Sequence, residues 1–305
     1  MNSVAREALL KPLAGTLASA LINPFAPFDS ALQAAFEANV QLALAEDIGD
    51  GDRTGLLVPA DDIVKAQVLV REAAVLCGAP WFEAVMHALE PSIVIDWRYA
   101  EGATMQADST VCVIAAPARA LLTAERCALN FLQLLSGVAS ATRRYVDVVE
   151  GTHAVILDTR KTLPGLRLAQ KYAVRVGGGQ NQRLALYDGI LIKENHIAAA
   201  GGIPQAMAAA LALNVGVPIQ IEVESLQQME AALTAGAVSV LLDNFTLQAM
   251  RDAVAQVRGR ALLEASGGVN LDTVRAIAET GVDRISIGSL TKDVRATDYS
   301  LRIVD

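Results

Sequence analysis

A dense group of basic residues lies between Arg126 and Lys193, in a chain whose formal net charge is −8. This stretch holds ten basic side chains and four acids, so it carries +6 and the rest of the chain carries −14. Arginine donates two parallel hydrogen bonds to a carboxylate, and lysine supplies a compact point charge. The segregation favours a site for a small anionic ligand over a merely solvated surface. The ten residues are Arg126, Arg143, Arg144, Arg160, Lys161, Arg167, Lys171, Arg175, Arg183 and Lys193.

Two glycine-containing segments near the C-terminus are typical of phosphate-binding turns. The segments EASGGVN and SIGSLT follow the last two predicted strands and place Gly267, Gly268, Gly288 and Ser289 there. Backbone N–H groups at such turns bind phosphate, and barrels commonly bind it after their last strands. The glycine run at 177–179 predicts only a tight turn.

Two carboxylates follow successive predicted strands. Glu222 and Asp243 have the placement expected of groups that accept hydrogen bonds from ribose hydroxyls or hold Mg²⁺. Their structural alternative is a salt bridge to Lys193 or Arg160. The three histidines lack metal-ligand spacing, and a structural role is expected for His87 and His153.

The elements that must position these residues alternate between strand and helix in the second half of the chain. Asp158, Lys193, Glu222, Asp243 and Glu264 sit at or just past the predicted strand ends, which share one mouth in a closed α/β barrel. The simpler explanation is that strand ends are polar because they leave the core. The predicted strands are His153 to Leu157, Gly189 to Ile192, Pro218 to Ile221, Val238 to Leu242, Ala261 to Leu263 and Arg284 to Ile287.

The first part of the chain has a different pattern. Residues 65–72, 92–102 and 109–121 are strand-like, residues 80–90 are helical, and a long helical stretch at 123–146 forms the join. This pattern predicts a separate N-terminal domain with a mostly antiparallel sheet.

Composition limits the classes of protein that the chain can belong to. Of its 305 residues 53% are hydrophobic and 4% aromatic, as expected of buried parallel strands with packed helices. The acidic balance argues against binding to nucleic acid or an anionic membrane. The three cysteines form no C-x-x-C pair, so a reducing cytoplasm is expected. We predict a terminal helix at residues 6–22 rather than a signal peptide, and a helix, turn and strand rather than a membrane span at residues 197–221.

Several segments together resemble the quinolinate phosphoribosyltransferase family over nearly the whole length. The most specific are DTRKTLPGLR and LIKENH. The others are EDIGDGDRTG, TAERCALNFLQLLSGVAS, QKYAVRVGGGQNQR, IEVESL, LLDNF, EASGGVN and GVDRISIGSLTKD.

The resemblance implies an α/β fold with an N-terminal α/β sandwich domain and an incomplete TIM-like α/β barrel. We expect the first domain at residues 1–130, the barrel at residues 131–290, and residues from about 291 to 305 packed back on the first domain. The family assembles as a homodimer with shared active sites. Its reaction joins quinolinate to 5-phosphoribosyl-1-pyrophosphate with Mg²⁺, giving nicotinate mononucleotide, pyrophosphate and CO₂ in NAD biosynthesis.

The resemblance also implies roles for particular residues. Glu222 and Asp243 match the acids near the ribose and the metal, and Thr159 precedes and orients Arg160. The 5-phosphate would be held by the turns of Ser266, Gly267, Gly268, Gly288 and Ser289. The quinolinate-binding cations would be Arg126 (from the partner subunit), Arg160, Lys161, Arg183 and Lys193.

One position departs from the family pattern, which has histidine where this chain has Gln182. Glutamine can hydrogen-bond a substrate carboxylate but cannot titrate. We therefore expect Gln182 to suffice if the position only donates a hydrogen bond.

Two other classes of protein fit part of the pattern. A lysine at the end of a barrel strand also occurs in Schiff-base lyases, and Lys193 fits that description. A non-catalytic or transport-associated relative would keep the fold but lose the basic clamp, and the clamp is retained here.

Overall fold

The computed structural model describes residues 20–304. They form two compact units. The first contains the chain up to Ser140, Pro164–Gly177 and the residues from Val294 onward, and the second contains Ala141–Leu163 and Gly178–Asp293. The terminal helix predicted at residues 6–22 falls largely in residues 1–19, outside the described residues.

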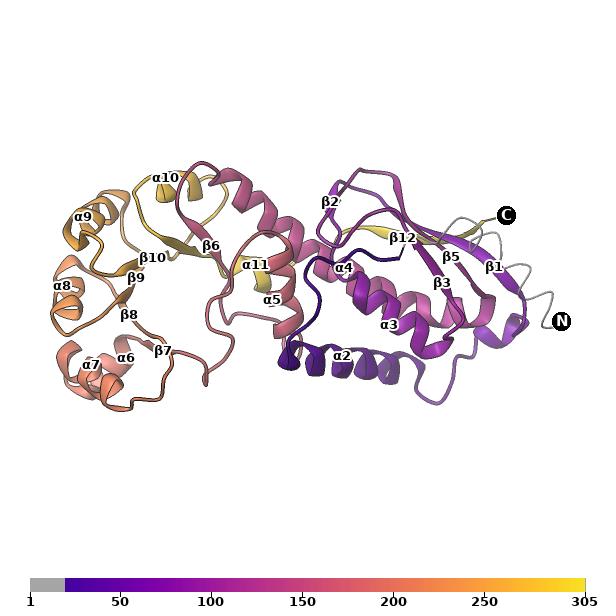
Figure 1. The fold of residues 1–305 in the computed structure, drawn as a ribbon, viewed down its shortest axis with the longest axis horizontal. Coiled ribbons are helices and arrows are strands. Elements are labelled where there is room, and N and C mark those ends of the chain that lie inside the picture. The colour runs from indigo at the N-terminus through magenta and orange to yellow at the C-terminus, as the bar shows by residue number, and fades with distance from the viewer. Residues whose placement is uncertain (1–19, 305) are drawn as a thin grey trace. The chain divides into compact units, whose positions relative to one another are not determined.

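The first unit is built on a four-stranded antiparallel sheet with the strand order β12-β1-β5-β3 (Figure 1). Its strands are β1 (Ile63–Val70), β3 (Val94–Trp97), β5 (Ser109–Pro117) and β12 (Tyr299–Val304), and a separate pair is formed by β2 (Ala74–Val75) and β4 (Thr104–Met105). Its helices are α2 (Ser30–Ile48), η1 (Gly55–Leu57), α3 (Ala79–Leu89), α5 (Arg167–Val176) and most of α4 (Ala118–Val148).

The core of the first unit follows from strand and helix periodicity. Alternate residues of β1, namely Ala66, Val68 and Val70, are fully buried. Helix α3 buries Trp81 and Phe82 against the same core. The antiparallel sheet and the helix predicted for this part of the chain are confirmed.

Helix α5 belongs to the first unit, whereas the sequence predicted that residues 131–290 form the barrel without interruption. Ala169, Tyr172 and Val176 are buried in the core of the first unit, where the Tyr172 ring lies 5.3 Å from that of Trp81. The apolar face of α5 therefore finds its partners outside the barrel. The main boundary between the units falls within α4, after Ser140.

The C-terminal strand completes the sheet of the first unit. Strand β12 pairs with β1 along its length, from Lys65 opposite Val304 to Val70 opposite Tyr299. The Tyr299 hydroxyl group lies 2.8 Å from the Ser136 hydroxyl group, and both residues are buried.

The second unit is an open barrel of six parallel strands with the order β6-β11-β10-β9-β8-β7. In Figure 1, α7 to α10 lie outside these strands. The strands are β6 (Val155–Leu157), β7 (Ile190–Ile192), β8 (Ile219–Val223), β9 (Ser239–Asp243), β10 (Leu262–Ser266) and β11 (Arg284–Ser286). The helices are α6 (Glu194–Ala200), α7 (Ile203–Ala212), α8 (Leu226–Thr234), α9 (Leu247–Val257), α10 (Val274–Ala278) and α11 (Ser289–Lys292).

All six predicted barrel strands are confirmed, but β8, β9 and β10 continue beyond their predicted ends to Val223, Asp243 and Ser266. Glu222 and Glu264 therefore lie within their strands, and Asp243 is the last residue of β9, whereas the sequence predicted that each would follow its strand. Within residues 20–304, β6 and β7 form no ladder with each other, which leaves the barrel incomplete. Alternate residues such as Ile221, Val240 and Leu263 pack under the helices, which turns the residues between them toward the barrel interior.

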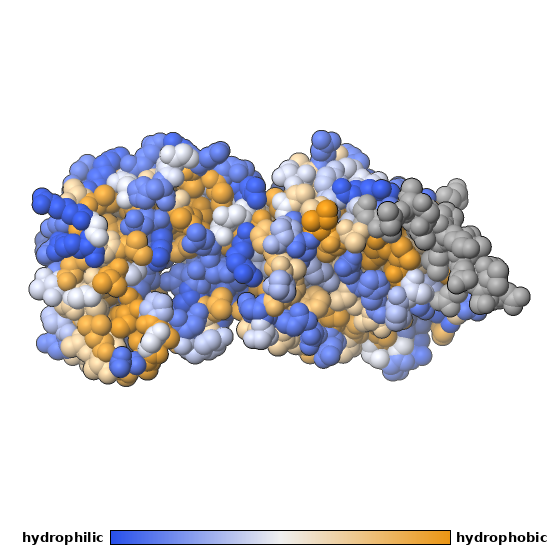
Figure 2. Space-filling view, in the orientation of Figure 1, coloured by the Kyte–Doolittle hydropathy of each residue, from blue (hydrophilic) through white to orange (hydrophobic). Residues whose placement is uncertain are grey.

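The stretch without charge at residues 197–221 forms most of α6, then α7, a connection and part of β8. The predicted helix, turn and strand are present, but two helices stand where the sequence predicted one. Within the described residues, no helix combines the length and apolar character needed to cross a bilayer. Figure 2 shows hydrophilic residues interspersed with hydrophobic ones on the visible surface of both units.

Candidate active site

Two cavities that share wall residues occupy the C-terminal ends of the barrel strands. The basic cavity has a volume of about 300 Å³ and is lined by Thr159, Arg160, Lys161, Gln182, Arg183, Leu191, Lys193, Glu222, Leu241, Glu264, Ser266 and Ser286. The glycine-lined cavity measures about 570 Å³. It shares six of these residues and adds Asp243, Asn244, Gly267, Gly268, Val269, Ile287, Gly288, Ser289 and Lys292.

The structure brings thirteen of the fourteen predicted site residues to these two cavities. The exception is Arg126, which belongs to the first unit and is exposed on α4. Of the other basic residues in the sequence cluster, Arg167, Lys171 and Arg175 lie on α5 in the first unit. The cluster seen in the sequence is therefore divided, and only four of its ten members line the cavities.

Those four cations make the basic cavity positively charged. Arg160, Lys161, Arg183 and Lys193 line it together with two carboxyl groups, those of Glu222 and Glu264. The Nε atom of Arg160 is buried and has no hydrogen-bond partner within the described part of the chain. A buried donor without a partner is costly, and a bound carboxylate would satisfy it.

Arg183 is held in place by the backbone beneath it. Its Nη1 atom donates to the carbonyl oxygen of Gly189 at 2.8 Å. Burial, and then the positive charge of Arg160, lower the pKa of Arg183. Like charges so close together favour an anionic ligand, because its charge relieves their repulsion.

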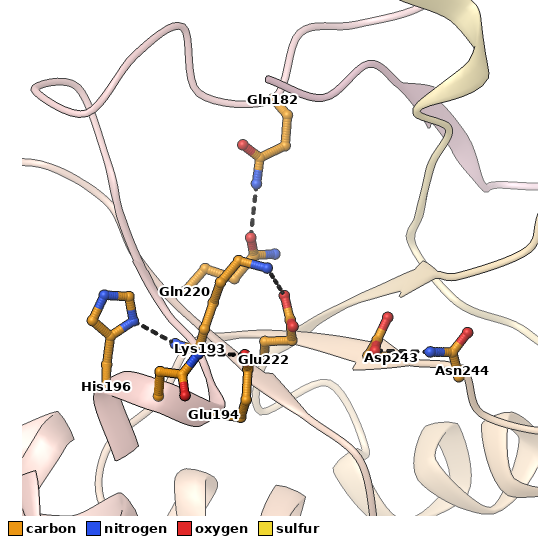
Figure 3. Close-up of polar contacts among 9 residues, drawn as sticks. Gln182, Lys193, Glu194, His196, Gln220, Glu222, Asp243 and Asn244 are labelled. Carbon is orange, nitrogen blue, oxygen red and sulfur yellow. Dashed lines mark hydrogen bonds and ion pairs between the residues drawn. The ribbon is translucent and has the colours of Figure 1, made fainter. Parts of the chain in front are cut away.

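Lys193 and Glu222 form an ion pair where the two cavities meet, with 2.8 Å between Nζ and Oε2 (Figure 3). Both residues line both cavities. The backbone N–H of Lys193 donates to Nδ1 of His196 at 3.0 Å, so this histidine fixes the start of α6. The salt bridge considered as the structural alternative for Glu222 is therefore present, but it sits inside the site.

The ion pair also bears on the Schiff-base alternative. A Schiff-base lysine needs an uncharged amine in a desolvated pocket. Lys193 faces a carboxylate, and 44% of its side chain is exposed. An amine that is ion-paired and partly exposed to solvent suits anion binding better than imine formation.

Asp243 is held by its neighbour in the chain. Nδ2 of Asn244 donates to Oδ2 of Asp243 at 2.9 Å (Figure 3). The backbone N–H of Asn244 donates to the carbonyl oxygen of Ser266 at the end of β10. Asn244 thus links the turns after β9 and β10, and sequence reasoning missed it although it directly follows a predicted site residue.

The glycine-lined cavity contains the turns predicted to bind phosphate. Gly267 has φ +100° and Gly268 has φ +60°, backbone conformations that favour glycine. Gly288 caps the short helix α11, and Lys161 approaches it closely enough that an added Cβ would lie 3.1 Å from Cδ of the lysine. Lys292 adds a cation that the sequence analysis did not select.

Gln182 is fixed at both its backbone and its side chain. Its backbone N–H donates to Oδ1 of the buried Asp158 at 3.0 Å. Its Nε2 donates to Oε1 of Gln220 at 2.8 Å, and Nε2 of Gln220 donates to Oε2 of Glu264 at 2.9 Å. Burial raises the pKa of Glu264, while the hydrogen bond from Gln220 opposes this rise.

The sequence analysis placed Glu264 among the polar residues at the barrel mouth but gave it no role, and it did not select Gln220. Gln220 stands two positions before Glu222 on β8, so strand periodicity turns it to the same side and could have indicated it. His87 and His153, expected to be structural, lie next to the Ile93 carbonyl oxygen and to Asp283.

The described residues contain no group of three or more His, Cys, Asp or Glu side chains arranged to hold a metal ion. A metal held by protein side chains alone is therefore not supported there. Two carboxylates do face the cavities, those of Glu222 and Asp243.

Comparison with known families matches the chain to two models. The model for the N-terminal domain of quinolinate phosphoribosyl transferase matches residues 52–136, and that for the C-terminal domain matches residues 138–302.

Individual relatives agree with the family models. A nicotinate-nucleotide pyrophosphorylase (carboxylating) of Mycobacterium leprae is 42% identical over 272 residues, covering 86% of this chain and 95% of the relative. The solved nicotinate-nucleotide pyrophosphorylase of Francisella tularensis is 41% identical with a TM-score of 0.86, covering 89% of this chain and 96% of its own. The corresponding structure from Ehrlichia chaffeensis is 40% identical with a TM-score of 0.85, covering 88% and 98%. The chain therefore belongs to the quinolinate phosphoribosyl transferase family.

Proposed function

We propose that the protein transfers phosphoribose from 5-phosphoribosyl-1-pyrophosphate to quinolinate, with loss of CO₂. The products are nicotinate mononucleotide and pyrophosphate, and the reaction serves NAD biosynthesis. The proposal is supported by family membership and by relatives named as carboxylating nicotinate-nucleotide pyrophosphorylases.

One observation carries the proposal: two chemically distinct cavities share Lys193 and Glu222. The basic cavity suits a planar dicarboxylate because two arginines and two lysines line it. The glycine-lined cavity suits a sugar phosphate because its turns expose backbone N–H groups and hydroxyl groups. A transfer between the two ligands would take place where the cavities meet.

In the first step, the lone pair of the pyridine nitrogen attacks C1 of the ribose. The bond between C1 and the pyrophosphate oxygen breaks, and pyrophosphate leaves with the electron pair. Positive charge develops on the sugar, so the carboxylates of Glu222 and Asp243 would stabilise it and accept hydrogen bonds from the ribose hydroxyls. No covalent bond to the protein is required.

In the second step, the carboxylate beside the cationic nitrogen leaves as CO₂. The electron pair remains on the ring carbon, where the neighbouring positive nitrogen stabilises it until a proton is added. Arg160 and Arg183 would hold the ring by its carboxylates, and we propose Lys193 as a source of the proton. A Lys193→Met variant with full activity would exclude that role.

The residues present fit a magnesium ion held jointly by protein and substrate. Mg²⁺ is usually bound through one or two carboxylates plus substrate phosphates, and Glu222 and Asp243 are available for this. When bound, the ion would stabilise negative charge on the leaving pyrophosphate.

We also propose that the protein is a homodimer in which Arg126 reaches the partner's site. Arg126 lies on α4 one turn before Asn130, which lines a groove of about 340 Å³ between α2 and α4 in the first unit. The groove includes Phe131 and Leu42, and the Leu42 residue is 67% exposed. This partly apolar surface suits a second copy of the chain. A cytoplasmic location remains a prediction, and the three free cysteines agree with it.

The experiment that tests the function measures nicotinate mononucleotide and CO₂ release from quinolinate, 5-phosphoribosyl-1-pyrophosphate and Mg²⁺. Nicotinate serves as the competing acceptor. We expect turnover with quinolinate alone, and a loss of roughly a hundredfold in kcat for Lys193→Ala because a charge in the reacting site is removed. A folded protein that is inactive with both acceptors would contradict the proposal and favour a non-catalytic relative.

A further inference from the structure

A chain of hydrogen bonds crosses the barrel interior from Gln182 to Glu264. Gln182 donates to Gln220, and Gln220 donates to Glu264, at 2.8 and 2.9 Å. Gln220 lies on β8 and Glu264 on β10, so the chain passes over the intervening strand β9. Figure 3 shows the first of these bonds, with Gln182 above Gln220.

Packing alone does not explain these polar side chains. The interior of a parallel barrel is usually filled by branched apolar residues. Gln220 is 7% exposed and Glu264 is 1% exposed, and burying such groups is costly unless they are hydrogen-bonded. Oε1 of Glu264 is buried and, among residues 20–304, has no partner within hydrogen-bonding geometry, although the Ser286 hydroxyl is near enough to act to lower the pKa of Glu264. By geometry this network is therefore not fully satisfied.

A third cavity lies beneath this row of hydrogen bonds. This basal cavity measures about 480 Å³ and is lined by residues at the start of the strands, such as Pro218, Ser239 and Leu262. It shares four lining residues with the basic cavity, including Gln182 and Glu264. Gln182 is therefore not held by a packed core below it. Its amide must be oriented by hydrogen bonds.

The donor-to-acceptor direction of these two hydrogen bonds determines how the amide of Gln182 is oriented. A glutamine side chain rotates easily about its last torsion, so the two ends of its amide exchange unless a partner selects one. Oε2 of Glu264 accepts from Nε2 of Gln220, which turns Oε1 of Gln220 toward Gln182. That oxygen in turn accepts one of the two hydrogens of Gln182 Nε2, which leaves the second hydrogen to donate to a substrate carboxylate.

We propose that Gln220 and Glu264 are positioning residues that orient the Gln182 amide and thereby set the affinity for the aromatic dicarboxylate. This inference rests on the proposed function, because it takes quinolinate as the ligand of the basic cavity. It assigns Glu264 a role as an acceptor, not as a charge.

The test compares substitutions that remove these hydrogen bonds with one substitution that preserves them. Gln220→Leu and Glu264→Leu each remove the hydrogen bonds at similar volume, and we expect the KM for quinolinate to rise roughly tenfold. Glu264→Gln can still accept from Gln220, so its KM should stay within about twofold of the wild-type value. The KM for 5-phosphoribosyl-1-pyrophosphate should change little in all three variants. Ser239→Ala, which alters only the basal cavity, is the matched control.

A double-substitution cycle separates positioning from a general effect on stability. In a Gln182→Ala background there is no amide left to orient, so adding Gln220→Leu should leave the quinolinate KM and the calorimetric affinity unchanged. Additive effects of the two substitutions would overturn the inference. So would equal damage by Glu264→Gln and Glu264→Leu, or a parallel rise in the KM of both substrates.

The wild-type protein distinguishes failure of this inference from failure of the proposed function. If wild-type protein converts and binds quinolinate while the variants behave as in the overturning results, only the positioning role fails. If wild-type protein neither converts nor binds quinolinate, the proposed function fails and the inference fails with it.

Discussion

Glu101 lies in the turn between β3 and β4 of the first unit, and its buried carboxyl group contacts the N-terminus of α3. Its Oε1 accepts hydrogen bonds from the backbone N–H of Gly78 at 2.8 Å and from the Tyr172 hydroxyl group at 3.0 Å. Its Oε2 accepts from the backbone N–H of Ala79 at 3.2 Å. Burial raises the pKa of Glu101 to about 7, although these hydrogen bonds act to lower it.

This pKa predicts that stability falls as pH rises. Between pH 4.5 and about pH 7 the unfolded chain has lost a proton that folded Glu101 keeps, so the free energy of unfolding decreases across this window by roughly 3 kcal/mol. The contribution is complete below pH 4.5 and is lost as pH passes 7. Urea unfolding followed by tryptophan fluorescence at several pH values measures it, because both tryptophans, Trp81 and Trp97, lie in the first unit.

Glu101→Gln provides the comparison for this prediction. The amide cannot ionise and loses one acceptor, so the variant should be less stable by about 1–3 kcal/mol at acidic pH yet show a shallower pH dependence. Identical pH slopes for the two proteins would show that Glu101 does not titrate in this range.

Residue positions were predictable where strand ends fixed them. Lys193, Glu222 and Asp243 were selected because each lies near the C-terminal end of a recognisable strand, and all three line the cavities. Glu264 was expected past the end of β10 but lies inside the strand. The polar residues after Leu263 made the apolar strand pattern end too early, so the last three residues of β10 were not predicted. Gln220 was missed although strand periodicity places it on the same side of β8 as Glu222. The single sequence does not show that its side chain meets those of Gln182 and Glu264 across the barrel.

The turn after β10 shows how an element positions Asp243, which we propose as a site residue. A Cβ added at Gly267 would lie 2.1 Å from Oδ1 of Asn244, whose Nδ2 donates to Asp243. The turns after β9 and β10 therefore approach each other so closely that only a residue without a Cβ atom fits at position 267.

Gly267→Ala should therefore impair the use of 5-phosphoribosyl-1-pyrophosphate. The methyl group must displace Asn244 and with it Asp243, and we expect kcat/KM for this substrate to fall roughly tenfold or more, since small displacements of positioned groups are costly. Gly259→Ala is the control, because Gly259 also has positive φ, at +75°, but an added Cβ meets nothing within 4 Å. The control should lose about 1–2 kcal/mol of stability and keep wild-type kinetics. Equal kinetic losses in both variants would point to backbone strain instead of the Asn244 contact.

The alternation of elements was readable from the sequence, but the membership of α5 was not. Periodicity identified all six barrel strands. Helix α5 lies between β6 and β7 in the chain, so local pattern assigns it to the barrel, whereas Tyr172 and Val176 bury their surface in the other unit. Such a partner is a long-range choice that the helix sequence does not encode by itself.

At the scale of the whole molecule, charge segregation predicted an anion site without locating all its members. The basic cavity takes Arg160, Lys161, Arg183 and Lys193, whereas Arg126 lies in the other unit. Proximity in the sequence suggested that all these residues belong to one site. They are divided because the polypeptide crosses between the two units within this stretch.

The proposed shared site predicts recovery of activity when two inactive proteins are mixed. Arg126→Ala and Lys193→Ala homodimers each lack one component, whereas a mixed dimer holds one site with both. Random exchange makes half of the dimers mixed, so about a quarter of wild-type activity should return. The assay is turnover after subunit exchange verified by mass spectrometry. No recovery after verified exchange would show that Arg126 does not act across subunits.

The pairing of β12 with β1 has a consequence for synthesis on the ribosome. The sheet of the first unit needs residues 299–304 at its edge, and these follow every strand of the barrel. At 5–20 residues per second, the edge of β1 stays uncovered for roughly 10 to 50 s while the barrel emerges. An uncovered strand edge invites pairing with other chains, so the nascent protein stays exposed to aggregation until nearly all of it has been made.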